Sequence, residues 1–231
     1  MKKFLFIIIC LCCGLLLTQI TLSILQNAIP AQSNTSRLLT PHTIVIDAGH
    51  GGNDPGKVGT DQTLEKDINL KIALYLKEIL ENQDMKVILT RDKDTDLSTT
   101  SSHSKLSDMK ERLSLIQKSD ANLVISIHQN SYTAPQVYGA QCFYLSTSEE
   151  SKKLAFLLQQ KIITSTNQTK IREIKGNSDY YLLKHSPVPT VIVECGFLSN
   201  PQEEELLRTE KYQRKMAWAI HLGILQYLNQ N

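Results

Sequence analysis

Short runs of β-branched and aliphatic residues alternate along this sequence with longer segments of helical periodicity, and this alternation limits the fold more than any other feature. Residues 43–47 (TIVID) and 190–195 (TVIVEC) are apolar at most positions, as in strands that are buried on both faces. Residues 64–81 instead repeat apolar side chains three or four positions apart, which is typical of one helix face. Strands that alternate with helices predict an α/β fold, with a mostly parallel sheet and helices on both faces.

The remaining predicted elements keep this order, and we find no internal repeat or second domain. With 231 residues, the chain is long enough for a single domain and a short additional segment. Further strands are expected at 86–90, 122–127 and 139–145, and further helices at 108–118, 148–165 and 210–228.

The chain begins with a hydrophobic segment behind a basic start. Lys2 and Lys3 precede an apolar run over 4–17, and polar residues dilute its continuation to Leu25. This order is typical of a secretory signal, and the whole segment is also just long enough to anchor a protein in a bilayer. No small-x-small cleavage motif decides between the two, so residues 1–25 are interpreted as a signal peptide or membrane anchor. Either one predicts an exported, extracytoplasmic protein that is membrane-anchored or secreted.

Residues 26–42 are rich in Ser, Thr, Asn and Pro and are expected to form a linker, so that the folded domain occupies residues 43–231. The basic start accounts for two of the 25 basic residues, and the remaining 23 equal the 23 acidic residues. A neutral domain without a basic stripe does not indicate nucleic-acid binding.

Four side chains that can bind a metal or move a proton stand at the ends of predicted elements. His50, His128 and Glu194 each follow or end a predicted strand, and Glu65 opens the first helix. Because α/β proteins bind ligands at the carboxyl ends of their strands, all four side chains are expected at one rim of the sheet.

Two imidazoles and one carboxylate form a three-ligand zinc set with a position left for water, and a remaining carboxylate can act as general base. Each residue also has a simpler interpretation. His50 in its glycine-rich loop resembles a surface histidine, and Glu65 resembles a charge on a solvated helix face. His128 could be a hydrogen-bonded core residue, and Glu194 could belong to a structural ion pair. The coincidence of all four favours a catalytic metal site.

The domain's cysteines and other histidines are not expected in this site. Cys142 and Cys195 are too few for a disulfide framework, and whether they pair is left open. Because neighbouring strand residues point to opposite faces, Cys195 should face away from Glu194. The other histidines are expected in the linker, in a loop or on helix surfaces: His42, His103, His185 and His221.

Five short motifs occur in the order and spacing of a known family. They are residues 46–52 (IDAGHGG), 64–67 (LEKD), 89–91 (LTR), 126–130 (SIHQN) and 193–200 (VECGFLSN). Over nearly all of residues 43–228 the chain resembles the zinc-dependent N-acetylmuramoyl-L-alanine amidases of the AmiC/CwlD class, most closely those that act in sporulation. Ala48 stands where many members have Pro, and Cys195 where Val or Thr is common, but neither position supplies a ligand.

The resemblance implies a six-stranded twisted sheet surrounded by helices. It also implies that His50, Glu65 and His128 bind one Zn²⁺ and that Glu194 is the catalytic acid and base. The substrate would be the peptidoglycan amide between the lactyl group of muramic acid and L-alanine. Arg91, at the end of a strand, is a candidate for binding a substrate carboxylate, because its guanidinium suits planar acceptors; a surface ion pair is the alternative.

Likeness to the sporulation amidases implies a role in the spore cortex, between the forespore membranes, where a downstream deacetylase allows the muramic δ-lactam to form. The membrane, through the N-terminal segment, and an activator protein are further expected partners, and the oligomeric state is left open. Three other functions also stay open: a vegetative cell-wall amidase, a zinc peptidase that cuts elsewhere in the stem peptide, and a non-catalytic wall-binding protein. Occupation of all four chemical positions speaks against the last.

Overall fold

The computed structural model describes residue 19 and residues 41–98 and 104–230. The chain divides into two units at Thr40/Pro41, and the second unit, Pro41–Asn231, carries the fold. The signal peptide or anchor expected at 1–25, apart from residue 19, and nearly all of the linker expected at 26–42 lie outside the described residues. Within the described ranges, no helix is both long and apolar enough to cross a bilayer.

Strands and helices alternate in the described part of the chain as the sequence predicts. The strands are β1 (Thr43–Ala48), β2 (Lys86–Leu89), β3 (Leu123–Asn130), β4 (Gln141–Leu145), β5 (Lys175–Asn177) and β6 (Thr190–Phe197). The helices are α2 (Glu65–Glu81), α3 (Lys105–Lys118), α4 (Glu149–Thr166), α5 (Tyr181–His185), α6 (Pro201–Leu207) and α7 (Glu210–Leu228). Sequence analysis missed β5, α5 and α6, because elements of three to seven residues are too short to show a period.

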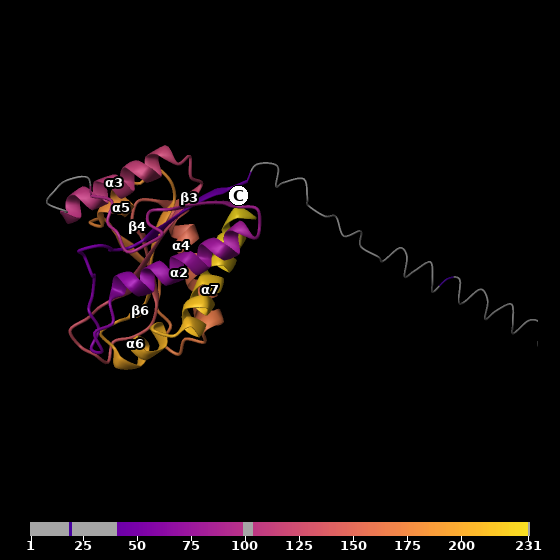
Figure 1. Ribbon diagram of the computed structural model, residues 1–231. Helices are drawn as coiled ribbons and strands as arrows, with labels where there is room; N and C mark the ends of the chain where they lie inside the picture. Colours follow the sequence, from indigo (N-terminus) through magenta and orange to yellow (C-terminus); the bar gives the residue numbers. More distant parts are fainter. Residues whose placement is uncertain (1–18, 20–40, 99–103, 231) are drawn as a thin grey trace, which may run out of the picture. The chain divides into compact units, whose positions relative to one another are not determined.

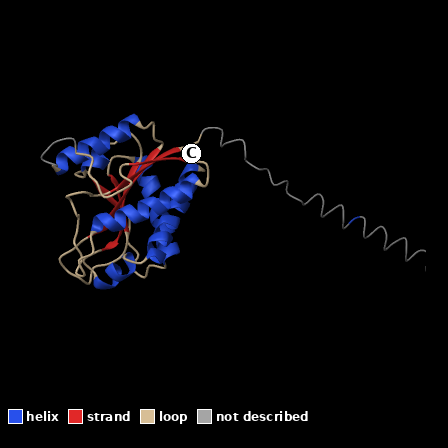
Figure 2. Cartoon of the chain, viewed as in Figure 1, coloured by secondary structure: helices blue, strands red, loops and turns tan. Residues whose placement is uncertain are grey.

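The six strands form one sheet in the order β2-β1-β3-β6-β4-β5. The pairs within β2-β1-β3-β6 are parallel, β4 runs antiparallel to β6, and β5 is parallel to β4. The predicted mostly parallel, six-stranded sheet is therefore confirmed. Since β1, β3 and β6 run in the same direction, their carboxyl ends meet at one rim (Figures 1 and 2).

Helices cover both faces of the sheet, as predicted. Helices α2, α4 and α7 pack on one face with strand residues such as Ile44 and Ile46, whereas α3 and α5 pack on the other with Val45 and Val124 (Figure 1). The alternation of Ile44, Val45 and Ile46 between the two faces explains why β1 is apolar at consecutive positions. Each such buried side chain contributes about 1.5–3 kcal/mol relative to an exposed one.

A larger part of the surface of helix α7 is buried than the sequence predicts. His221, expected on a helix surface, is only 1 % exposed, and within the described residues neither ring nitrogen has a hydrogen-bond partner. Its ring lies 4.8 Å from that of Trp218. The expectation was wrong because α7 contacts both α2 and α4, so its buried face is wider than a single stripe. Gly223 allows the close approach to α4, since a Cβ there would lie 2.8 Å from Cα of Leu158.

Candidate active site

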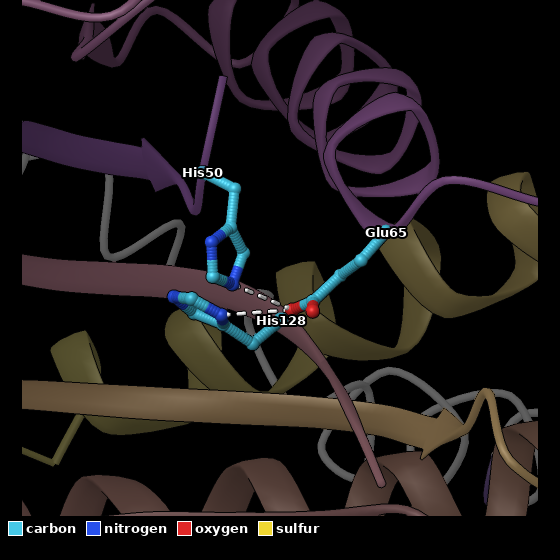
Figure 3. A group of neighbouring side chains, drawn as sticks. All are labelled: His50, Glu65 and His128. Carbon is cyan, nitrogen blue, oxygen red and sulfur yellow. Dashed lines mark hydrogen bonds and ion pairs between the residues drawn. The ribbon is translucent and has the colours of Figure 1, made fainter. Parts of the chain in front are cut away.

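Four polar side chains stand at the rim where β1, β3 and β6 end. His50 follows β1, His128 and Glu194 lie near the ends of β3 and β6, and Glu65 is the first residue of α2. The ligand atoms of His50, Glu65 and His128 all lie within 4.8 Å of one another (Figure 3). The structure therefore brings together the three side chains that sequence analysis proposes as metal ligands.

One oxygen of Glu65 faces both imidazoles. Its Oε1 atom lies 2.9 Å from Nδ1 of His128 and 3.3 Å from Nε2 of His50 (Figure 3). The two rings meet edge to face, with centroids 4.9 Å apart. Two imidazole nitrogens and one carboxylate that converge in this way match the donor set that catalytic zinc sites use, with a fourth position left for water.

The electrostatics of this group favour the binding of a cation between its side chains. Burial would raise the pKa of Glu65, but hydrogen bonds from His128 and His50 outweigh it and hold that pKa well below its usual range. Burial would lower the pKa of His128, but the hydrogen bond and charge of Glu65 outweigh it and raise the pKa to about 9. The buried, ionised carboxylate of Glu65 attracts a metal cation as it attracts a protonated imidazole. The donor atoms and the negative charge of Glu65 therefore both fit a metal ion.

Glu194 lies beside this group, as the residue of β6 that pairs with His128 of β3. Within the described residues, nothing donates a hydrogen bond to its buried Oε2 atom. Burial raises the pKa of Glu194 to about 7, although the charge of His128 opposes the shift. A carboxylate with a pKa near neutrality can both accept a proton and return it, as a general acid and base must.

The cysteines lie apart from this chemistry. Cys195 and Cys142 are fully buried in the core on the α2, α4 and α7 side, and both are free thiols. The prediction that Cys195 faces away from Glu194 is confirmed, and the two cysteines do not form a disulfide. Burial raises the pKa of the Cys142 thiol, so it stays protonated at neutral pH.

Asp54 orients His50, a role that sequence analysis missed. Its Oδ2 atom lies 2.8 Å from Nδ1 of His50, so that Nε2 of the same ring faces Glu65. Its Oδ1 atom accepts the backbone N–H of Gly56 and pairs with Lys105 at 3.0 Å. A carboxylate on the far nitrogen of a ligand histidine fixes the orientation and tautomer of the ring. The only sequence signal is an acid four residues after His50.

Arg91, the candidate for substrate binding, is buried under the turn that carries His50. Its Nε atom donates to the carbonyl oxygen of Ala48 at 2.9 Å, and its Nη2 atom donates to those of Gly49 at 3.0 Å and Lys66 at 2.8 Å. The guanidinium therefore holds the backbone that precedes His50. This is not the surface ion pair that we considered as the alternative, and a contact with substrate stays a prediction.

A second buried arginine, Arg112 of α3, holds the same turn. Its Nη1 atom donates to Oδ1 of Asp47 at 2.6 Å and to the carbonyl of Ala48 at 2.8 Å, and its Nη2 atom donates to the carbonyl of His50 at 2.7 Å. Burial alone would raise the pKa of Asp47, but the charge of Arg112 and the hydrogen bond from Ser126 outweigh it and lower the pKa to about 2. The pair therefore stays ionised although it is buried.

Glycine is required on both sides of His50. A Cβ atom on Gly49 would overlap the imidazole of His128, so glycine makes room for that ring. Gly51 has a φ of 136°, and a Cβ there would lie 2.8 Å from the side chain of Arg91. His50 itself has a φ of 61°, in the left-handed region that few side chains adopt. The network around the turn stabilises this conformation.

Comparison with known sequences agrees with this geometry. A sequence model of the N-acetylmuramoyl-L-alanine amidase family matches residues 44–226. The germination-specific N-acetylmuramoyl-L-alanine amidase of Bacillus subtilis (strain 168) is 39% identical over 196 residues, which cover 83% of this chain and 82% of that protein.

Solved structures lead to the same family. The CwlD amidase from Clostridioides difficile, solved in complex with the GerS lipoprotein, matches with a TM-score of 0.79 at 43% identity, over 82% of this chain and 100% of that one. An N-acetylmuramoyl-L-alanine amidase from Clostridium difficile 630 matches with a TM-score of 0.76 at 34% identity, over 83% and 98%.

Fold, site and comparisons together define a hydrolase in which a metal-type donor set lies beside a buried carboxylate. The chain belongs to the N-acetylmuramoyl-L-alanine amidase family, in its AmiC/CwlD class.

The Arg112 network generates a stability prediction. Arg112→Met should lower the free energy of unfolding by about 3–5 kcal/mol, because it leaves the Asp47 carboxylate buried without its partner. Denaturant unfolding at neutral pH measures this loss. The matched control is Lys152→Met, which breaks the exposed pair with Glu149 and should cost less than about 1 kcal/mol.

The same loss should depend on pH. Because the pKa of Asp47 is lowered from 3.8 to about 2 in the folded state, its ionisation stabilises the fold above pH 3.8, and this contribution is lost as the pH falls through about 2. The difference between wild type and Arg112→Met should therefore shrink in acid. A difference below about 1 kcal/mol at neutral pH would contradict the assigned role.

Proposed function

We propose that this protein is a zinc-dependent N-acetylmuramoyl-L-alanine amidase that acts in maturation of the spore cortex. It hydrolyses the amide between the lactyl group of muramic acid and the L-alanine of the stem peptide. The observation that carries the zinc assignment is the convergence of His50, Glu65 and His128 within 4.8 Å, next to a carboxylate that does not belong to the donor set.

The described residues have distinct tasks in this reaction. His50, Glu65 and His128 would hold one Zn²⁺, and Asp54 would keep the His50 ring in place. When bound, the ion supplies Lewis-acid chemistry, polarising the scissile carbonyl and making a water molecule more acidic. Glu194 takes the proton from the attacking water and returns it to the departing amine of L-alanine. Its pKa of about 7 suits both transfers.

Two rival activities are separated by their products. A zinc peptidase with the same site would cut within the stem peptide and leave L-alanine on the muramic acid, whereas a non-catalytic wall-binding protein would release nothing. Mass spectrometry of muropeptides digested by the purified protein with zinc distinguishes the three cases. Release of intact stem peptides with a free L-alanine amine is the expected result.

The sporulation role is supported by the names of two relatives. One is a germination-specific amidase, and the other is the CwlD amidase solved with the GerS lipoprotein. By analogy, we infer that this protein acts between the forespore membranes with a lipoprotein activator, and that a deacetylase then acts on the exposed muramic acid. A vegetative wall amidase is the alternative, since the same catalytic residues would serve it.

The proposed location rests on the N-terminal segment. Residues 1–25 would export the domain as a signal peptide or keep it at the membrane as an anchor. If the anchor is retained, the roughly 16 residues at 26–41 can reach about 50 Å when fully extended. Cutting would then be confined to wall material close to the membrane.

Zinc binding is tested by removing one ligand. His128→Ala should lower the zinc content of the dialysed protein from about one ion per chain to near zero, because the two remaining ligands do not complete a catalytic site. Elemental analysis measures the content, and circular dichroism checks the fold. His185→Ala, on the exposed end of α5, should keep its zinc. Full zinc occupancy in His128→Ala would exclude His128 as a ligand.

The role of Glu194 is tested by an isosteric change. Glu194→Gln should retain zinc and the fold but lose turnover by about two orders of magnitude or more, because an amide cannot accept the proton. Steady-state rates on muropeptides measure the loss. Glu149→Gln, exposed at the start of α4, serves as the matched control and should remain fully active. Activity of Glu194→Gln within a few-fold of wild type would make Glu194 structural.

The biological role predicts a spore phenotype. Spores of a deletion strain should contain cortex without muramic δ-lactam and should germinate poorly, because the deacetylase then lacks its substrate. Muropeptide analysis of purified cortex measures the lactam, and complementation with Glu194→Gln should not restore it. Normal δ-lactam in the deletion strain would overturn the sporulation role while leaving the amidase chemistry intact.

A further inference from the structure

A cavity of about 200 Å³ adjoins the site between α3 and the segment that opens α5. Its floor is the sheet face that carries Ser126 and Ile192, which pair across β3 and β6. The next pair on the same face of these strands, towards their carboxyl ends, is His128 and Glu194, and both also line the cavity. The cavity therefore begins at His128 and Glu194 and extends over the sheet towards the amino-terminal ends of β3 and β6.

The walls of this cavity are apolar and aromatic. Met109 of α3 lies on one side, and Tyr180 and Leu182 lie on the other. We call the space bounded by Met109, Tyr180, Leu182 and Ile192 the α5 cleft. It is smaller than the roughly 300–1,000 Å³ of a pocket for a whole drug-sized ligand, so it suits one unit of a longer polymer.

Tyr180 is held in place although 39 % of it is exposed. Its ring meets that of Phe143 at 5.7 Å and an angle of 60°, and its backbone N–H donates to Oδ1 of Asn177 at 2.7 Å. Burial and the charge of Glu194 raise the pKa of the Tyr180 phenol, which agrees with a ring standing beside the catalytic carboxylate. An exposed aromatic ring that is fixed in advance binds a ligand at low entropic cost.

The lining of the α5 cleft selects among the parts of the substrate. Among the described residues that line the cavity there is no lysine or arginine, and the carboxylate of Asp47 is already paired with Arg112. A stem peptide carries carboxylates of its own, for which this lining offers no guanidinium or ammonium partner. The sugar ring of the glycan is uncharged and offers an apolar face and an acetamido methyl group, which match an aromatic ring and an aliphatic floor.

We propose that the α5 cleft binds the N-acetylmuramic acid unit, with the sugar ring against Tyr180 and the acetamido methyl group over Leu182 and Ile192. This inference rests on the proposed amidase function and adds a subsite to it. The cleft then fixes the glycan side of the scissile amide, and the stem peptide leaves the site on another side. Tyr180 is thus a positioning residue for the substrate.

The test compares three variants on a disaccharide muropeptide. Tyr180→Ala should raise KM about tenfold and change kcat less than about twofold, because one aromatic contact is lost while Glu194 is untouched. Tyr180→Phe keeps the ring and should stay within about twofold of wild type in both constants. Phe156→Ala removes an aromatic side chain of similar exposure on α4 and should change neither. The expected change of tenfold corresponds to about 1.4 kcal/mol.

A second measurement uses inhibition by the sugar alone. N-acetylmuramic acid should inhibit wild type competitively, with a Ki about tenfold higher for Tyr180→Ala, and muramic acid without the acetyl group should inhibit wild type more weakly. An unchanged KM and Ki in Tyr180→Ala, a loss in kcat alone, or equal inhibition by the two sugars would each overturn the proposal. If wild type does not cut the lactyl–L-alanine bond of the muropeptide, the proposed function itself fails, and the subsite with it.

Discussion

The ion pair between Asp47 and Arg112 is the interaction on which the rest of the site depends. It lies between the sheet and α3, and the guanidinium that neutralises Asp47 also binds the carbonyls of Ala48 and His50. Arg91 holds the same backbone from another side. Removal of two charges from water is costly unless their hydrogen bonds are satisfied, and here the Asp108 carboxylate and backbone carbonyls accept further donors of Arg112. The result is a rigid turn in which His50 keeps a left-handed conformation.

Rigidity at this turn matters because the side chains of the site come from separate elements of the fold. His50 stands on a turn, His128 on a strand and Glu65 at a helix start. Glu65 also accepts the backbone N–H groups of Lys57 and Gln129, at 2.7 Å and 3.0 Å, so one carboxylate links two of these segments. The proposed Zn²⁺ would tolerate little displacement of these side chains, and the contacts limit that displacement before an ion binds.

The sequence predicts the sheet, the helices and the reactive side chains better than it predicts the hydrogen bonds and ion pairs that hold those side chains in position. Residues 43–47 and 190–195 reveal strands because burial on both faces demands consecutive apolar residues, and the polar residues that end these runs are conspicuous. Asp54 gives only the weak signal of an acid four residues after His50, and Arg112 gives none, since its partner Asp47 lies in a distant segment. Each looks like an ordinary surface charge. Helix α5 is too short to show a period. The α5 cleft could therefore not be predicted from the sequence, although Tyr180, one of its walls, can be identified there as an aromatic residue.

The spacing of the ligand residues along the chain has a consequence for how the protein matures. His50 and Glu65 lie near each other in sequence, whereas His128 lies beyond α2, β2 and α3 and is brought to them by the pairing of β3 with β1. Closing so long a loop is entropically costly and comes late relative to local helix formation. A chain that is still unfolded therefore offers at most a partial ligand set. If the site holds the proposed Zn²⁺, its uptake would be coupled to completed folding, and the bound ion would tie the first and third strands together against unfolding.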